Sequence, residues 1–386
     1  MFRSFLFLYR KVSWLMTINF CIPCLLGMEG FIADELRALE AENVCAENGR
    51  VLFSGDENIL ARVNICSRFA ERVQIVVGSF VAKTFEELFQ GTKSLEWEKW
   101  IGSRDAFPVK GYSINSTLFS VRDCQAIIKK AVVERLKSKY SIQWFDETGP
   151  VHQIQFSFNK DVVTLLLDTS GAGLHKRGYR PQSNAAPIKE TLAAALCNAS
   201  RLRSYHTLYD PMCGSGTILV EGALMAMNIA PGLNRNFSCD RWEQLDRSIW
   251  KTEMERARDL EKRDCDFMAI GSDISSEAVE LAILNAKQAG VADKIKVSVA
   301  DIRNFKGETE KGTLICNPPY GERLLDIEEA SRLYSVMGKV FERKHGWSYT
   351  VISPSETFEQ DFGRRADKRR KLYNGMIKCQ VYMYFK

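Results

Sequence analysis

The sequence is poor in residues that bind metals. It contains only four histidines, which lie far apart and form no HExxH or similar motif. Its eleven cysteines are scattered, and the single CxxC, Cys21 to Cys24, has no second pair at the spacing of a zinc site. We therefore expect no metal ion, and we interpret the thiols as reduced residues of a cytoplasmic protein.

Long apolar runs are also absent. A membrane-spanning helix requires about 20 consecutive apolar residues, and the apolar N-terminus is interrupted by Arg3, Arg10 and Lys11. We expect residues 1–15 to be an unstructured or non-core extension, with Met16 as an alternative start and a membrane-surface helix as the competing interpretation. The chain also has no large excess of one charge, since its formal net charge is +5. This mild charge permits a polyanionic partner without requiring one.

The front half of the chain predicts two small α+β modules. Residues 16–70 alternate between strand-like and helical patterns. The second module comprises residues 71–170. Its predicted elements are an extended segment, a helix and two strands, at 118–122, 124–139, 152–158 and 162–168.

The back half, residues 171–386, predicts a doubly wound parallel sheet, because strands and helices alternate regularly after a glycine-rich basic connector at 171–183. A charged insertion at 231–263 interrupts this alternation. The Asn374-Gly375 pair lies between two strand-like runs, which is a hairpin signal. We therefore expect the sheet to end in an antiparallel strand.

A glycine loop, DPMCGSG at residues 210–216, lies between the first strand and the first helix of this sheet. Ligands of such sheets lie beyond the carboxyl ends of the strands, and two glycines allow a tight turn and a close approach. A Walker A loop would need a lysine after Gly216, and the dinucleotide fingerprint would need a glycine where Leu219 stands. An acid before the loop disfavours phosphate and favours a cation, so we predict the cofactor S-adenosylmethionine, bound by Asp210, Cys213, Gly214 and Gly216.

Two further acids follow the next two predicted strands. Asp273 and Ile274 come after the second strand, and Asp301 and Ile302 after the third. We expect Asp273 to accept the ribose hydroxyls of the cofactor and Asp301 to accept its adenine amine. Either acid could instead cap the following helix, but Ser275 already supplies a cap after Asp273.

Four motifs carry a resemblance to a known family: LHKRGYR, PIKETLAAAL, DPMCGSGTILVEGA and NPPYGERL, at 174–180, 187–196, 210–223 and 317–324. The chain resembles the class I S-adenosylmethionine-dependent RNA methyltransferases that carry a THUMP domain, in particular the bacterial rRNA guanine-N2 enzymes. The resemblance implies a ferredoxin-like domain at 16–70 and an RNA-binding THUMP domain at 71–170. It also implies a Rossmann-like, seven-stranded methyltransferase domain at 171–386.

The segment NPPY, residues 317–320, ends a strand-like run. It is either a rigid turn or a site for a base amine, a poor nucleophile because its lone pair is conjugated with the ring. The Asn317 side-chain oxygen and the Pro318 carbonyl could each accept one amine hydrogen and aim the lone pair at the methyl group. Pro318 and Pro319 would hold these acceptors rigidly, with Pro319 among the residues that bind the substrate. Tyr320 would stack on the base after it leaves its helix.

Three groups of basic residues are candidates for RNA contacts. Most charge runs are solvated helix faces, and the alternative is a surface that binds phosphates. The candidates are Lys129 and Lys130 on the helix at 124–139, Arg177 and Arg180 in the connector, and Lys368 and Arg369 in a cluster before the terminal hairpin.

Three hypotheses about function remain at this point. The leading one is an enzyme that methylates N2 of a guanine in 23S rRNA. The second keeps the chemistry but changes the substrate to a tRNA guanine or to adenine N6, because NPPY accepts either amine. The third is a non-catalytic RNA-binding assembly protein that retains an inactive cofactor fold.

Overall fold

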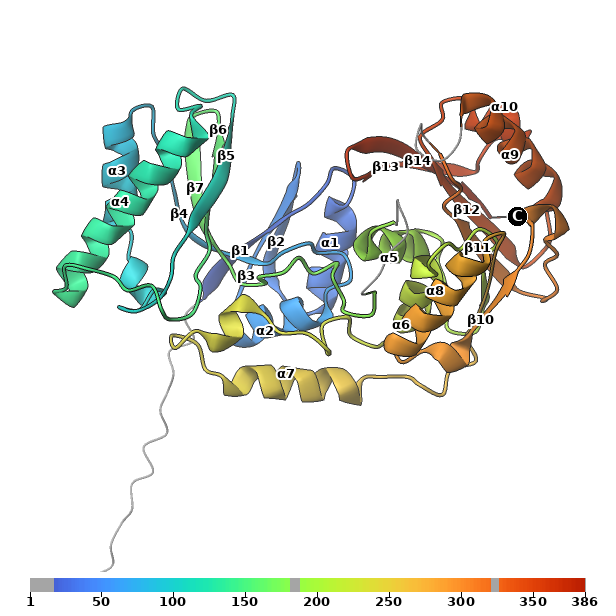
Figure 1. Ribbon diagram of the computed structural model, residues 1–386, viewed down its shortest axis with the longest axis horizontal. Helices are drawn as coiled ribbons and strands as arrows, with labels where there is room; N and C mark the ends of the chain where they lie inside the picture. Colours follow the sequence, from blue (N-terminus) through green and yellow to red (C-terminus); the bar gives the residue numbers. More distant parts are fainter. Residues whose placement is uncertain (1–16, 181–187, 321–325, 386) are drawn as a thin grey trace, which may run out of the picture.

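The computed structural model describes residues 17–180, 188–320 and 326–385. The expected extension at 1–15 lies outside these residues. The described strands form two seven-stranded sheets, one in each half of the chain (Figure 1). Within the described ranges, no helix combines the length and the apolar character that crossing a membrane would require.

The first sheet is continuous across both predicted front modules. Its order is β2-β3-β1-β4-β7-β6-β5. Strand β4 joins the modules, since it pairs antiparallel with both β1 and β7. The strands are β1 Ile18–Pro23, β2 Glu42–Glu47, β3 Arg50–Gly55, β4 Gln74–Val81, β5 Val109–Ile114, β6 Ile154–Asn159 and β7 Val162–Asp168.

Three of the four described helices of this half, α2, α3 and α4, start at side-chain caps, whereas Met28 before α1 provides none. The Asp56 carboxylate accepts from the Ile59 N–H at 2.9 Å, and Thr84 and Glu87 form a capping box. The extended segment predicted at 118–122 is wrong, because Ser120 caps a helix that begins at Val121. The helices are α1 Glu29–Ala38, α2 Glu57–Cys66, α3 Phe85–Ser94 and α4 Val121–Tyr140, with a 3₁₀ turn at Trp97–Lys99.

The second sheet has the order β10-β9-β8-β11-β12-β14-β13. Its first five strands are parallel and β14 is antiparallel to β12, so the predicted doubly wound sheet with an antiparallel end is confirmed. The central strand β11 is buried along its whole length, as its apolar sequence favours. The strands are β8 Thr207–Asp210, β9 Met268–Asp273, β10 Ile295–Val299, β11 Gly312–Cys316, β12 Trp347–Ser353, β13 Lys368–Asn374 and β14 Ile377–Tyr384.

Helices cover both faces of the second sheet. Helices α5, α6 and α8 lie on one face and α9 and α10 on the other (Figure 1). The bounds are α5 Glu190–Ala199, α6 Thr217–Ala226, α7 Ser248–Asp259, α8 Ser276–Gln288, α9 Ile327–Val340 and α10 Phe358–Phe362, with 3₁₀ turns at Ser238–Arg241, Ala292–Lys294 and Ile302–Asn304.

The charged insertion at 231–263 packs against the front half of the chain. Its helix α7 lies beside α2 (Figure 1), where the Arg62 guanidinium donates to both oxygens of Glu253 at 2.9 Å. The Trp242 ring of the insertion stacks on His152, with ring centroids 4.2 Å apart. The insertion therefore ties the second half of the chain to both front modules.

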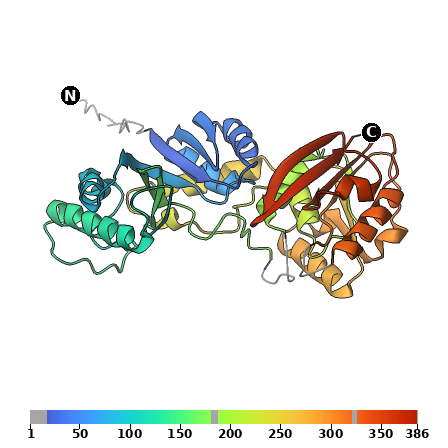
Figure 2. The same cartoon turned by 90° about the horizontal axis from the view of Figure 1, so that it is seen from above.

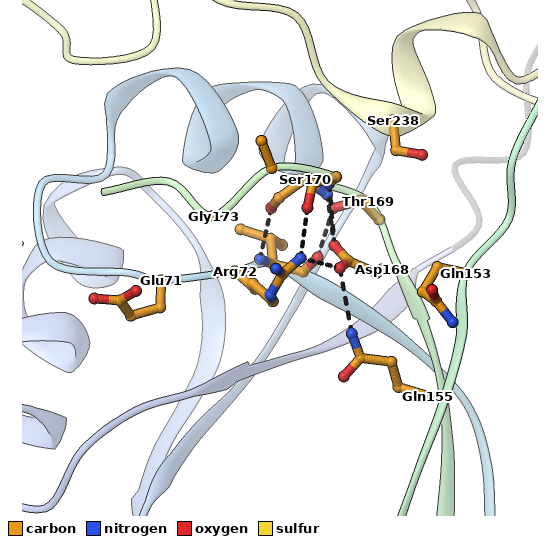
Figure 3. Close-up of polar contacts among 12 residues, drawn as sticks. Glu71, Arg72, Gln153, Gln155, Asp168, Thr169, Ser170, Gly173 and Ser238 are labelled. Atoms are coloured by element: carbon orange, nitrogen blue, oxygen red, sulfur yellow. Dashed lines mark hydrogen bonds and ion pairs between the residues drawn. The ribbon is translucent and has the colours of Figure 1, made fainter. Parts of the chain in front are cut away.

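A buried carboxylate holds the start of the connector (Figure 3). Asp168 is 1% exposed, and it accepts hydrogen bonds from Arg72, from the Ser170 N–H at 3.0 Å and from the Gln155 amide at 3.3 Å. Burial raises the pKa of this carboxyl although Arg72 opposes the change. Arg72 lies two residues before β4, and Asp168 is the last residue of β7. This ion pair therefore holds the end of β7 next to the start of β4.

Candidate active site

The strand order of the second sheet reverses between β8 and β11. Ligands of such sheets bind beyond the carboxyl ends of the strands at this point. The two strands are neighbours, since Leu314 pairs with Tyr209. Asp210 ends β8 and Asn317 follows β11, so the glycine loop and the NPPY segment lie side by side.

The glycine loop adopts the left-handed backbone that its sequence predicts. Gly214 and Gly216 have φ values of 51° and 76°, a region that glycine enters without steric cost. A Cβ atom on Gly216 would lie 2.9 Å from the Cβ of Ala282 on α8. Glycine at this position therefore allows both the turn and the close packing of α8 against the loop.

Asp210 is a buried acid with few partners. It is 1% exposed and accepts one hydrogen bond, from the Met212 N–H at 3.3 Å, among the contacts of the described residues. Burial raises the pKa of this carboxyl to about 8, and the nearby Asp273 adds to the increase. A cation next to Asp210 would restore its ionised form, so the position fits the cationic groups of S-adenosylmethionine.

Asp273 connects the glycine loop to the start of α8. One oxygen accepts from the Gly214 N–H at 2.9 Å and the other from the Ser275 N–H at 3.0 Å. Ser275 caps α8 as predicted, accepting from the Ala278 N–H at 3.1 Å. Each Asp273 oxygen keeps a second lone pair that could accept from a ribose hydroxyl. The adjacent Ile274 side chain is 73% exposed, which leaves an apolar surface for a bound ligand.

Asp301 is already paired with a neighbour. Its carboxylate lies 2.6 Å from the Arg303 guanidinium and also accepts from the Arg303 N–H at 2.8 Å. The hydrogen bonds from Arg303 lower the pKa of Asp301 to about 2. The capping alternative is thus realised here, beside the buried Ile302, and a contact between Asp301 and adenine stays a prediction.

The NPPY segment contains an orphaned acceptor. The Asn317 side-chain oxygen is buried and has no hydrogen-bond partner among residues 17–180, 188–320 and 326–385. Pro318 is buried beside it. An unpaired buried acceptor is costly in a folded protein, so this oxygen is suited to a donor that arrives with a ligand.

Tyr320 is held by the terminal hairpin. The Asn374 amide donates to its hydroxyl oxygen at 2.7 Å, and the Cys379 sulfur lies 3.8 Å away. Burial raises the pKa of the Tyr320 hydroxyl well above its ordinary value. These contacts fix the direction of the ring, and its stacking on a base stays a prediction.

The two cysteines of the site are unsuited to act as nucleophiles. Cys213 in the glycine loop and Cys316 at the end of β11 are both buried. Burial raises the pKa of each thiol well above its ordinary value. Both therefore remain protonated thiols at neutral pH.

The structure corrects the prediction for the two connector arginines. Arg177 is 5% exposed and its guanidinium donates to the Leu174 carbonyl at 2.7 Å. Arg180 lies 3.1 Å from the buried Glu190. Their donors are used inside the protein, so neither is available to RNA phosphates. The sequence signal that we missed is a pair of acids, Glu190 and Glu221, within otherwise apolar helices, because buried acids require cationic partners.

The remaining basic candidates differ in accessibility. Lys129 donates to the Phe107 carbonyl at 3.1 Å and pairs with Glu147 at 2.5 Å, whereas Lys130 is exposed. Lys368 is also exposed, and Arg369 pairs with Glu359 at 3.2 Å while its side chain stays 55% exposed. Both lie on β13 itself, so the prediction that they precede the hairpin is wrong.

Comparison with family models identifies three parts of the chain. The RMKL-like methyltransferase domain matches residues 177–383, the RlmL ferredoxin-like domain residues 19–74, and the THUMP domain residues 82–168. The chain belongs to the RMKL-like methyltransferase family. The front half is accordingly a ferredoxin-like domain followed by a THUMP domain.

The relatives named for their activity are methyltransferases. The chain is 42% identical to YpsC of Bacillus subtilis (strain 168), provisionally named an RNA methyltransferase, over 93% of this chain and 94% of YpsC. It is 32% identical to the ribosomal RNA large subunit methyltransferase K/L of Shewanella baltica (strain OS155), over 95% of this chain. The chain spans about half, 53%, of the length of that K/L protein.

Two solved structures share the fold over nearly the whole chain. One is a Listeria monocytogenes protein described as a predicted N6-adenine-specific DNA methylase, with a TM-score of 0.91 and 44% identity over 96% of both chains. The other is the methyltransferase-like protein SMU.472 complexed with S-adenosylhomocysteine (SAH), with a TM-score of 0.91 and 40% identity over 96% of this chain and 98% of that chain. With the family match, this likeness identifies S-adenosylmethionine as the cofactor.

Proposed function

We propose that this protein transfers a methyl group from S-adenosylmethionine to N2 of a guanine in 23S rRNA, in the cytoplasm. The observation that carries the proposal is the Asn317 side-chain oxygen beside the glycine loop, which is buried and has no hydrogen-bond partner in the part of the chain that the structure describes. S-adenosylmethionine held at the loop would supply the electrophilic methyl carbon. Asp210, Gly214 and Asp273 are the residues that would hold the donor.

The chemistry requires two acceptors for one base amine. Asn317 accepts one amine hydrogen through its side-chain oxygen, and the Pro318 carbonyl accepts the other. These two hydrogen bonds orient the nitrogen lone pair and stabilise the positive charge that develops on the nitrogen. Pro319 restricts the backbone next to these acceptors. The Tyr320 ring, whose hydroxyl is held by the terminal hairpin, stacks on the base.

The choice of RNA rests on the front domains and on the relatives. A THUMP domain is an RNA-binding module in the family that the chain resembles, and the K/L relative is named for large-subunit rRNA. Because the chain spans 53% of that relative, its substrate is carried over here as part of the proposal. Exposed Lys130 and Lys368 are the basic residues retained as phosphate contacts.

Adenine N6 is the second candidate. The Listeria structure is described as a predicted N6-adenine-specific methylase, and two hydrogen-bond acceptors suit either exocyclic amine. Guanine is favoured because the four sequence motifs resemble those of the rRNA guanine-N2 enzymes. The two candidates yield different methylated nucleosides. An analysis of the methylated nucleoside therefore separates the two candidates.

The test uses 23S rRNA from a strain that lacks this protein. The purified protein and S-adenosylmethionine should produce N2-methylguanosine, detected by mass spectrometry of the nucleosides. Asn317→Ala should lower the methylation rate by about 100-fold or more while calorimetry shows unchanged cofactor binding. Asn236→Ala, an exposed asparagine in the insertion, is the matched control. N6-methyladenosine as the product, or a fully active Asn317→Ala variant, would refute the proposal.

A further inference from the structure

The tip of the terminal hairpin projects past the active-site edge of the sheet. The last residue of β12, Ser353, pairs with Gln380 of β14, yet β14 begins three residues earlier, at Ile377. At about 3.3 Å per residue, the hairpin extends about 10 Å beyond the end of β12. Since β12 is parallel to β11, this is the edge where Asn317 lies.

The tip presents unburied apolar side chains. Met376 is 95% exposed and Ile377 is 47% exposed, and Gly375 provides the turn with a φ of 62°. Lys378 lies next to Ile377 near the tip, and Lys371 lies opposite Gln380 at the base of the projecting part. Both lysines are exposed. An apolar point with cationic sides resembles the wedges that proteins insert between stacked bases.

The hairpin is braced on two sides. On one side, Asn374 and Cys379 contact the Tyr320 hydroxyl, at 2.7 Å and 3.8 Å. On the other, the Arg370 guanidinium donates to the Gly27 carbonyl at 2.9 Å and lies 3.7 Å from the centroid of the Phe31 ring. Figure 2 shows the two strands running from the methyltransferase domain toward the front half. The tip is thus fixed next to the NPPY segment.

We propose that Met376 is a wedge that enters the RNA stack at the position the target base leaves. The inference rests on the proposed function, because a base must leave its helix to reach Asn317. The thioether side chain would fill the apolar gap in the stack, and Ile377 would cover its edge. Lys378 would contact a phosphate beside the gap, and Lys371 one farther along the strand, toward the base of the hairpin.

The experiment compares a paired and an unpaired form of one substrate. Once nucleoside mapping has located the guanine, two short RNAs are made: one with this guanine paired to cytosine in a stem, and one with that cytosine deleted. Met376→Ser should lower kcat/KM about tenfold on the paired RNA and leave the unpaired RNA within about twofold of the wild type. Met376→Leu should restore the rate on the paired RNA.

Controls separate the wedge from a general defect. Leu260→Ser changes another exposed apolar side chain, which is 49% exposed and directly follows α7, outside the terminal hairpin. This variant should behave as wild type on both RNAs. With 2-aminopurine beside the guanine, the wild type should raise the fluorescence of the paired RNA on binding, and Met376→Ser should raise it less. Equal rates for Met376→Ser and the wild type, or an equal loss on both RNAs, would overturn the wedge.

Failure of the proposed function would be recognised separately. In that case the wild-type protein would methylate neither RNA, whatever residue stands at position 376. If the wild type methylates both RNAs and the Met376→Ser variant is unaffected, the proposed function stands and only the wedge is wrong. Mapping the guanine to an unpaired, unstacked position in native 23S rRNA would also overturn the wedge.

Discussion

The buried carboxyl of Asp210 predicts a pH dependence of cofactor binding. Its ordinary pKa is 3.8, and burial raises the pKa to about 8. Between these values the unfolded chain has released the proton and the folded protein retains it, so the free energy of unfolding falls as pH rises toward 8. Above about pH 8 both states are ionised and the dependence ends.

The magnitude follows from the two pKa values. At about 1.36 kcal/mol per pH unit, and allowing for half-titration at the folded pKa, Asp210 lowers the stability by about 2 kcal/mol between pH 6 and pH 8. A cationic ligand binds the ionised form, so its affinity should rise about 50-fold over the same interval. Asp210→Asn should remove both dependences, since an amide of the same shape has no proton to lose.

The assay is calorimetry of S-adenosylmethionine binding at pH 6, 7 and 8, with urea unfolding at the same pH values. Comparing variants removes the contribution of the titrating amino group of the cofactor. Asp301→Asn is the matched control, because the pKa of Asp301 is held at about 2 and this acid stays ionised throughout. An Asp210→Asn variant that keeps the wild-type slope in both measurements would refute the reasoning.

Three further predictions concern two buried arginines and one accessible lysine. Removing one partner of the buried pair between α2 and α7, as in Arg62→Ala, should lower the free energy of unfolding by about 3–5 kcal/mol. Replacing Arg62 and Glu253 together by leucine should restore most of it; equal urea midpoints for Arg62→Ala and wild type would contradict this. Lys368→Ala should reduce the salt dependence of RNA binding by about one counterion, measured by filter binding, without changing stability. Arg177→Ala should lower the stability without changing the salt dependence of RNA binding. An unfolding midpoint unchanged from the wild type would contradict the buried role of Arg177.

The parts of the site that depend on local sequence could be predicted. The glycine loop, the Ser275 cap and the apolar strand before Asn317 each follow from a few neighbouring residues, and the structure contains all three. The failure at 118–122 is also local, because Ser120 caps a helix inside a run of strand-forming residues. Propensity favoured a strand there, and the cap together with packing of α4 favoured a helix.

The features that were missed depend on contacts between distant segments. Nothing near Arg177 indicates that its partner is Glu221 on α6, so the connector resembled an exposed basic strip. The docking of the insertion through Glu253 and Trp242 likewise joins segments far apart in the chain. Such pairings are set by the tertiary fold, which periodicity does not report.

Strand β4 has a further consequence for how the front half behaves. The two matched family ranges, 19–74 and 82–168, leave nearly all of β4 between them, yet β4 supplies the pairing partner of β1 on one side and of β7 on the other. Separating the domains there would leave an open strand edge on at least one of them, and open edges invite aggregation. The ferredoxin-like and THUMP domains therefore match two separate family models but share one continuous sheet, so a cut between them would expose backbone groups that the intact chain pairs.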